Sequence, residues 1–287
     1  MSERPLAATL ISPSELAGRL SDPSLRVFDA TVRLVRPPGG GPYTPESGRA
    51  TYETAHIPGA SFADLVDELA APAPLPFALP SASRFAEAAG RLGIAPGTKV
   101  VVYAQESPMW ATRLWWLLRY FGFDDVRVLD GGLPAWRAAG LPLDPAPRAY
   151  PGTLFTATPR PGLLARRSDV EQIVASGSSC LVNALAPEVF RGEGTTSYSR
   201  PGRIPGSLNA PAKSLLDEKG CFLPREELAT RLADLLEEPS LVAYCGGGIS
   251  ATIVVFALSL LGRDDVRLYD GSLAEWSADP SLPLALG

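Results

Sequence analysis

Residues 241–250 read Leu241-Val242-Ala243-Tyr244-Cys245-Gly246-Gly247-Gly248-Ile249-Ser250, and this stretch decides the fold. Its first four residues are apolar and prone to form a strand. A longer apolar run, 251–261, follows the stretch and ends at Gly262, as a helix does. A strand followed by a helix is the unit of a parallel sheet, where ligands collect beyond the carboxyl ends of the strands. We therefore expect Cys245 at the ligand-binding edge.

The cysteine and its glycines predict a reactive sulfur. Backbone N–H groups and a helix N-terminus favour an anion, and the thiolate is the nucleophilic form of cysteine. Three glycines let the loop curl, including into positive φ, so that its N–H groups can surround the sulfur. The predicted binding loop is Gly246, Gly247, Gly248, Ile249 and Ser250. Taken alone, the segment also fits a buried packing cysteine beside a slack loop.

An internal repeat favours the reactive reading. Residues 101–105 match 241–245 at an offset of 140, and the same offset relates 121–128 to 261–268, 130–133 to 270–273, and Trp136 to Trp276. Upstream, Phe28-Asp29-Ala30 answers Val182-Asn183-Ala184, and His56-Ile57-Pro58-Gly59-Ala60 answers Arg203-Ile204-Pro205-Gly206-Ser207. The chain thus contains two copies of one domain. Gln105 stands where the second copy has Cys245, so only the second copy keeps the nucleophile.

Each copy alternates short apolar runs with helical patterns, which predicts an α/β fold with a parallel sheet flanked by helices. The expected domains are 6–145, non-catalytic, and 162–287, catalytic, joined by a proline-rich linker over 146–161. Expected strands in the second copy are 180–184, 241–244 and 266–269, and expected helices are 225–237 and 251–261. In the first copy they are strands 100–103 and 126–129 around a helix over 110–121.

Composition narrows the function classes. Lysine and arginine total 26 and aspartate and glutamate 31, which gives a net charge of −5. This acidic balance does not favour binding to nucleic acid. The longest apolar run is too short to cross a membrane, and the first residues lack a signal-peptide pattern. Three cysteines without a CxxC motif indicate a reducing compartment and no disulfide, so we expect a cytoplasmic protein. A single histidine argues against a zinc site, and no metal is expected.

Several motifs together resemble a known family. They are Phe28-Asp29-Ala30, His56-Ile57-Pro58-Gly59-Ala60, Arg113-Leu114-Trp115-Trp116 and Asp130-Gly131-Gly132-Leu133-Pro134-Ala135-Trp136, with Tyr269-Asp270-Gly271-Ser272 and Trp276 in the second copy. The chain resembles a tandem-domain rhodanese sulfurtransferase. This resemblance implies that Cys245 takes sulfur from thiosulfate or 3-mercaptopyruvate as a persulfide and passes it to cyanide or a thiol, without metal or organic cofactor. A carrier protein is a further acceptor that the family allows.

Two departures leave the donor open. The loop after Cys245 has no cation, which resembles the mercaptopyruvate-type loop, yet Gly247 replaces the hydroxyl residue expected there. Val189 stands where the family has an arginine that grips the donor. Arg191, Arg200 and Arg203 lie nearby as substitutes, although solvated arginines are the commoner case. Ser250 keeps a hydroxyl, whose simpler role is to cap the following helix.

Two residues of the first copy are further candidates. The resemblance gives His56 an acid/base role, whereas a structural role would tether it to Asp29; both positions change together in the second copy, which favours the structural role. Trp110 fits the core of the first domain, and its place near a helix start also lets it reach the cleft between domains.

Two other functions compete with sulfur transfer. A cysteine phosphatase needs an arginine in the loop to grip the phosphoryl group, and none appears between Cys245 and Arg263. A catalytically weakened sulfur carrier or regulatory binding module is kept open by Val189 and by the missing loop hydroxyl.

Overall fold

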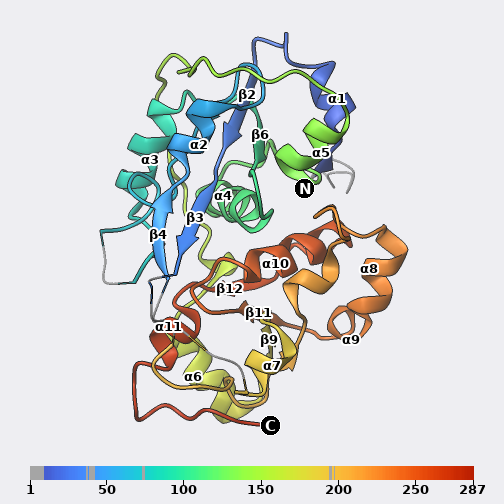
Figure 1. The fold of residues 1–287 in the computed structure, drawn as a ribbon. Coiled ribbons are helices and arrows are strands. Elements are labelled where there is room, and N and C mark those ends of the chain that lie inside the picture. Colours follow the sequence, from blue (N-terminus) through green and yellow to red (C-terminus); the bar gives the residue numbers. More distant parts are fainter. Residues whose placement is uncertain (1–9, 37, 39–42, 73–74, 194–195, 197) are drawn as a thin grey trace.

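The computed structural model describes residues 10–36, 38, 43–72, 75–193, 196 and 198–287. The chain forms two halves, one above the other in Figure 1, with helices α4 and α10 between them. The expected start of the first domain, residue 6, lies outside the described residues. Among those described, no helix is long and apolar enough to span a membrane.

The first half contains one parallel sheet and an added hairpin. Its sheet has the strand order β1-β7-β6-β2-β5, and β3 pairs antiparallel with β4. The elements are β1 (Leu10–Ile11), α1 (Pro13–Ala17), β2 (Leu25–Asp29), β3 (Val32–Val35), β4 (Thr44–Ser47), α2 (Arg49–Thr54), β5 (Ser61–Phe62), α3 (Ala82–Arg91), β6 (Lys99–Tyr103), α4 (Met109–Tyr120), β7 (Val126–Leu129) and α5 (Gly132–Ala138).

The second half repeats this topology. Its parallel sheet has the order β8-β12-β11-β9-β10, and each strand matches the strand at the same place in the first sheet. The elements are η2 (Pro161–Leu163), β8 (Leu164–Ala165), α6 (Arg167–Ser176), β9 (Cys180–Asn183), α7 (Pro187–Phe190), β10 (Leu208–Asn209), η3 (Ala212–Leu215), α8 (Arg225–Arg231), α9 (Ala233–Leu236), β11 (Leu241–Tyr244), α10 (Ala251–Leu260), β12 (Arg267–Tyr269) and α11 (Ser272–Trp276). The predicted α/β fold with two repeated domains is confirmed.

The strand and helix around the cysteine form where the sequence predicts them. All four residues of β11 are buried between β9 and β12, and α10 is buried on every side over 251–259. The prediction of one continuous helix over 225–237 is wrong, because the structure divides it into two helices. Leu232 adopts φ −109° and ψ 14°, which ends α8, and α9 starts one residue later. The break leaves Leu228, Leu232 and Leu235 all buried.

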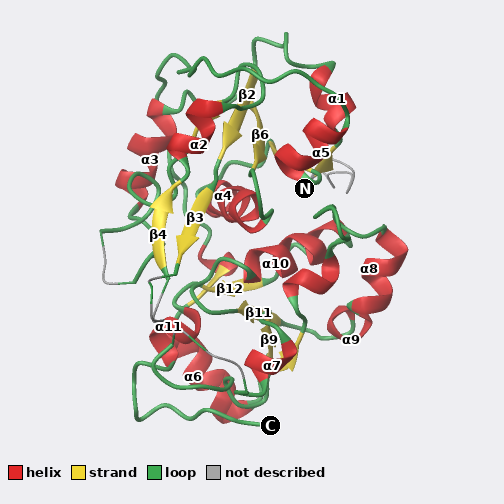
Figure 2. Ribbon diagram, viewed as in Figure 1, coloured by secondary structure: helices red, strands yellow, loops and turns green. Residues whose placement is uncertain are grey.

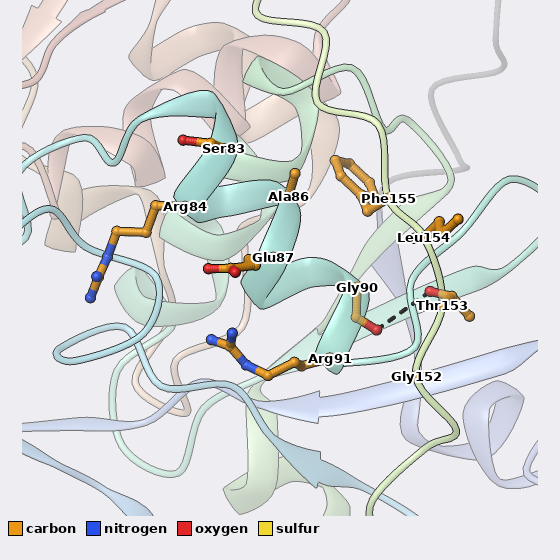
Figure 3. A pocket seen from close by; sticks show the side chains of 10 residues that line it. All are labelled: Ser83, Arg84, Ala86, Glu87, Gly90, Arg91, Gly152, Thr153, Leu154 and Phe155. Carbon is orange, nitrogen blue, oxygen red and sulfur yellow. Dashed lines mark hydrogen bonds between the residues drawn. The ribbon is translucent and has the colours of Figure 1, made fainter.

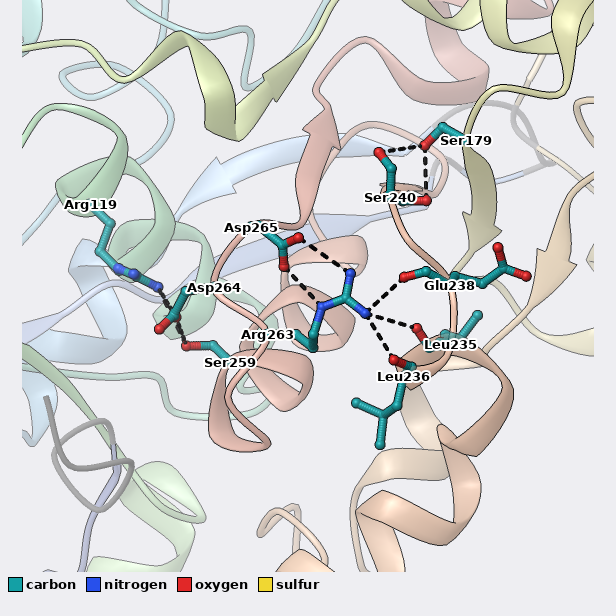
Figure 4. A network of polar contacts seen from close by, with 10 residues as sticks. All are labelled: Arg119, Ser179, Leu235, Leu236, Glu238, Ser240, Ser259, Arg263, Asp264 and Asp265. Carbon is teal, nitrogen blue, oxygen red and sulfur yellow. Dashed lines mark hydrogen bonds and ion pairs between the residues drawn. The ribbon is translucent and has the colours of Figure 1, made fainter. Parts of the chain in front are cut away.

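The two halves meet about a pseudo-twofold axis between α4 and α10. Thr112 and Thr252 lie 140 residues apart in the sequence, and their hydroxyl oxygens form a hydrogen bond of 2.7 Å. Arg119 lies 3.4 Å from its own counterpart Ser259 and forms an ion pair of 3.0 Å with Asp264 (Figure 4). Equivalent surfaces of the two copies therefore pack on each other, as in an isologous interface.

A polar network fixes the segment that leads into β11. The Arg263 guanidinium donates to the carbonyls of Leu236 at 3.1 Å and Glu238 at 2.9 Å, and it pairs with Asp265 (Figure 4). These bonds tie the end of α9 to the segment that follows α10. The start of β11 is thereby fixed relative to the helix on the other side of the cysteine loop.

Among the described residues, the hairpin β3–β4 occurs in the first half and has no equivalent in the second, and Figure 2 shows it extending toward the second half. It follows β2 directly, at the carboxyl edge of the first sheet. Leu34 and Tyr43 are 40% and 42% exposed, which is high for large apolar side chains. The hairpin therefore presents apolar surface at the interdomain edge.

The segment between the halves packs along the first domain (Figure 3). Residues 146–160 have no regular structure, as extended proline-rich chain predicts. Thr153 bonds through its backbone N–H to Gly90 and through its hydroxyl to Ile94, and Arg160 forms two 2.7 Å bonds with Asp124. The division into 6–145, 146–161 and 162–287 stays our proposal.

Arg113 of α4 joins both halves from a buried position. Its guanidinium donates to the carboxylate of Asp270 at 2.6 Å and the carbonyl of Gly248 at 3.3 Å, in the second half. It also donates to the carbonyl of Phe77 at 2.7 Å, and the other Asp270 oxygen accepts from the Leu79 N–H. The Arg113 and Asp270 side chains are only 2% and 13% exposed.

We expect Arg113→Met to lower the free energy of unfolding by about 3–5 kcal/mol, because it leaves the Asp270 carboxylate buried without its counter-ion. Arg19→Met is the matched control: it removes an exposed pair with Glu15 and should cost less than about 1 kcal/mol. Urea denaturation of the two variants measures the difference. Equal costs would show that the buried pair contributes no more than a surface pair.

Candidate active site at the domain interface

The loop that begins at Cys245 is pinned to the start of α11. The backbone N–H of Leu273 donates to the Cys245 carbonyl at 3.1 Å, and that of Ala274 to the Gly246 carbonyl at 2.8 Å. The Cys245 N–H donates to the Ser272 hydroxyl at 3.1 Å. Cys245 itself is 2% exposed at the end of β11. The backbone that carries the sulfur is therefore fixed by the neighbouring helix.

The rest of the loop offers unused hydrogen-bond donors. Among the described residues, none accepts a bond from the backbone N–H groups of 246–250. Gly248 has φ +74°, a conformation that glycine adopts without strain, and its carbonyl points to Arg113. Carbonyls of this loop are thus bonded while successive N–H groups stay available, which suits an anion.

The sulfur faces a cavity of about 240 Å³ that both halves enclose. The second half supplies the loop, Leu185, Tyr198 and Ala274, and the first half supplies the opposite wall. That wall consists of Leu34, Tyr43, Pro45, Pro76, Phe77, Met109 and Trp110. The half without a nucleophile therefore supplies about half of the residues that line the cavity around Cys245.

Tyr198 lies against the loop. A Cβ atom on Gly246 would overlap the Tyr198 hydroxyl, so the phenol rests directly on the glycine backbone. Burial, the charge of Cys245 and the neighbouring Tyr43 raise the pKa of Tyr198 above its ordinary value. The phenol is therefore protonated and uncharged at neutral pH.

The arginines proposed as donor ligands do not line this cavity. Arg191 is exposed and pairs with Glu193 at 2.8 Å. Arg200 donates to the carbonyls of Ser277 and Asp279, at the end of α11. Arg203 lies over the Phe190 ring and donates to the carbonyl of Gly287 at 2.7 Å. Backbone acceptors and surface acids occupy these guanidinium groups, so the structure brings none of them to Cys245.

Ser250 and Trp110 do reach the cavity. Trp110 is 2% exposed and packs on Phe77, with ring centroids 5.2 Å apart. The expectation that Ser250 caps α10 is wrong in detail, because its hydroxyl makes no capping bond. Its backbone is helical, at φ −63° and ψ −23°, whereas a capping side chain needs an extended residue.

His56 lies buried in the first domain, outside the cavity lining. Its Nδ1 bonds to the Tyr52 carbonyl at 2.7 Å and its ring stacks on that of Tyr52. The expected tether to Asp29 is not formed. The Asp29 carboxylate instead accepts from Thr31 and, at 2.8 Å, from the Gln105 side chain. Gln105, which replaces the cysteine in the first copy, thus donates a hydrogen bond to a buried carboxylate. Burial raises the pKa of this Asp29 carboxyl group.

A second interdomain cavity, of about 1230 Å³, is the counterpart of the first. It is lined by Glu106, Ser107 and Pro108, the repeat equivalents of the three loop glycines, and by Cys221. Burial and the carboxylates of Asp130 and Asp217 raise the pKa of Cys221 to about 11. Burial raises that of Cys180 similarly, to about 11. Neither thiol is suited to nucleophilic work at neutral pH.

No cluster of histidine, cysteine or acidic side chains suited to a metal occurs in the part of the chain that the structure describes. The hairpin, Phe77 and Tyr198 line the cavity, although the sequence did not predict a role for them. A partial signal existed for the hairpin: the offset between the copies falls from 154 at Phe28 to 147 at His56, which marks extra residues in the first copy.

Comparison with known proteins agrees with this geometry. The model of the rhodanese-like domain matches residues 12–139 and 188–279. A probable 3-mercaptopyruvate sulfurtransferase of Pseudomonas aeruginosa is 37% identical over 98% of this chain and 99% of its own. A putative thiosulfate sulfurtransferase of Mycobacterium tuberculosis is 35% identical over 97% of each.

Among solved structures, the 3-mercaptopyruvate sulfurtransferase of Escherichia coli superposes with a TM-score of 0.79. It is 30% identical and covers 92% of this chain and 98% of its own. One of the two family matches lies in each half of the chain. The chain belongs to the rhodanese family of sulfurtransferases and contains two rhodanese-like domains.

Proposed function

We propose that this sulfurtransferase carries the transferred sulfur as a persulfide on Cys245. One observation carries the assignment: Cys245 lines a cavity between the domains and begins a loop whose next five N–H groups make no bond among the described residues. The position equivalent to it in the first domain is Gln105, which cannot form a persulfide. Cys180 and Cys221 have raised pKa values and lie on other elements.

The reaction takes place in two displacements. With thiosulfate, the Cys245 thiolate attacks the outer sulfur, the S–S bond breaks, and its electron pair leaves with sulfite. With 3-mercaptopyruvate, the thiolate attacks the thiol sulfur, the C–S bond breaks, and its electron pair leaves with the enolate of pyruvate. The second step returns the thiolate: cyanide or an acceptor thiolate attacks the outer sulfur and becomes thiocyanate or a persulfide. No electrons enter or leave, so the cycle needs no cofactor.

The loop stabilises each anion in turn. Backbone N–H groups fixed in advance around the sulfur interact with the thiolate, with the persulfide and with the charge that passes between them. A small-molecule donor and a small thiol or cyanide are the partners we propose. The three cysteines are free, which keeps a reducing compartment such as the cytoplasm as our proposed location.

A binding or regulatory module without catalysis is the second candidate, favoured by Val189 in place of the family arginine. A phosphatase fits less well, because the first arginine after Cys245 is Arg263, whose guanidinium bonds the carbonyls before β11 and Asp265.

Exposure of the purified protein to thiosulfate and, separately, to 3-mercaptopyruvate should add one sulfur atom to the Cys245 peptide. Intact mass and peptide mapping measure the addition, and cyanide should remove it as thiocyanate. Cys245→Ser is expected to gain nothing, whereas Cys221→Ser should load normally. A folded protein with a free Cys245 thiol that gains no sulfur from any donor would favour the binding module.

Gly246→Ala should slow the loading of Cys245 by about 10- to 100-fold, because its methyl group displaces Tyr198 and shifts the loop. Gly162→Ala, outside the cavity lining, is the control. Its Cβ meets nothing within 4 Å, so loading should stay close to that of the unchanged protein. Stopped reactions analysed by mass give both rates. Equal slowing in the two variants would contradict the packing of Tyr198 on Gly246.

A further inference from the structure

The cavity beside Cys245 contains no charged side chain among its described lining residues. The internal residues outside the description (37, 39–42, 73–74, 194–195 and 197) are proline, glycine, alanine, threonine and serine, so none of them is basic. Arg191, Arg200 and Arg203 bond elsewhere, as shown above. A donor therefore meets backbone N–H groups around its sulfur and uncharged groups beyond it.

Two further arginines lie near the site without entering it. Arg113 lies beneath the loop, where its charge is paired with Asp270 at 2.6 Å. Arg36 lies over the Tyr43 ring, 5.2 Å from the centroid, and is exposed on the hairpin. Neither is a lining residue. The Arg36 guanidinium therefore contacts a residue of the cavity wall without lining the cavity itself.

The wall opposite the sulfur is apolar and aromatic. It is formed by the side chains of Leu34, Tyr43, Phe77, Met109 and Trp110. Tyr198 adds an uncharged phenol beside the loop. The thiosulfate dianion placed here would meet the loop N–H groups with its outer sulfur, but its SO3 end would lose hydration without gaining a counter-ion, which is costly. An aryl or alkyl group would instead bury apolar surface.

We propose that this cavity selects sulfur donors with an apolar organic body and at most one negative charge, and that it discriminates against dianionic thiosulfate. The proposal rests on the proposed persulfide function of Cys245 and adds the chemical class of its donor. Leu34, Phe77 and Trp110 determine the specificity, since they contact the part of the donor that leaves.

The transfer from such a donor balances in the same way as before. With an arenethiosulfonate, the Cys245 thiolate attacks the terminal sulfur and the S–S bond breaks. The electron pair leaves with the arenesulfinate, and the sulfur stays on Cys245 as a persulfide anion. The total charge is unchanged, and no oxidant or reductant takes part.

The test compares thiosulfate with 4-methylbenzenethiosulfonate, in which a tolyl group replaces one charged oxygen. We measure thiocyanate formation with cyanide as acceptor and divide each kcat/KM by the rate of that donor with free cyanide. This ratio corrects for the intrinsic reactivity of the two donors. The normalised value should be at least about tenfold higher for the thiosulfonate. This factor is modest, because burying a charge without a counter-ion costs more free energy than a tenfold change in rate represents.

Equal or higher normalised use of thiosulfate would overturn the proposal while leaving the persulfide function intact. Absence of sulfur on Cys245 from both donors and from 3-mercaptopyruvate would instead overturn the proposed function. Mass measurement of the Cys245 peptide separates the two failures.

A cation introduced at the rim should weaken the preference for the thiosulfonate. Leu34 lines the cavity and is 40% exposed, so Leu34→Arg can place a guanidinium there without burying it. The normalised kcat/KM for thiosulfate should rise about tenfold, since opposite charges a few ångströms apart attract strongly at a protein surface. Leu34→Gln loses the same apolar contact without gaining charge and should give no such rise.

A final variant tests the exposed arginine. Arg36→Gln should leave the preference between the two donors within about twofold, because the Arg36 guanidinium lies over the Tyr43 ring and does not line the cavity. A tenfold loss of thiosulfate use in this variant would show that the hairpin supplies a donor-binding cation, and the proposal would be overturned.

Discussion

The buried guanidinium of Arg113 is the constraint on which the rest of the site depends. A charge at this depth needs hydrogen-bond acceptors and a close counter-ion. Arg113 meets that requirement with acceptors from both halves: Phe77 in the first, and Gly248 and Asp270 in the second. The same bonds hold the carbonyl of the loop and the segment that forms the cavity wall. Loop and wall are therefore positioned by a single group.

The repeat explains how one half remains a scaffold. In the first domain Gln105 bonds the buried Asp29, and Thr31 completes the set of donors to that carboxylate. In the second domain the equivalents are Cys245 and Asn183, so the carboxylate has become an uncharged amide. A buried carboxylate at this place would repel a thiolate. The two changes fit together: the cysteine occupies the copy from which the negative charge has been removed.

Much of the fold could be predicted from the sequence because it rests on local pattern and on the repeat. The strand 241–244 and the helix that follows were predicted to within one residue, since continuous apolar runs bounded by glycine permit few alternatives. The helix over 225–237 was not, because its break at Leu232 satisfies the burial of three leucines rather than any local signal.

The candidate site divides in the same way. The loop of Cys245 could be read from one contiguous segment, whereas the cavity wall could not, because Leu34, Phe77 and Trp110 come from three separate segments of the other domain. Arg200 and Tyr198 are two residues apart in sequence, yet only Tyr198 faces the sulfur. Which of them does so depends on the carbonyls at the end of α11, which bind the guanidinium. Tertiary acceptors of this kind leave no trace in a sequence.

The hairpin β3–β4 has a consequence for how such a protein can evolve. It lies in the half in which Gln105 replaces the cysteine, it is largely exposed, and the described part of the second half contains no counterpart. Substitutions in it change neither the thiol nor the N–H groups around it, and they leave the α4–α10 interface unchanged. Under the donor selection that we propose, mutations in the first copy of the domain alter which sulfur compound is used, while the persulfide chemistry stays with the second copy.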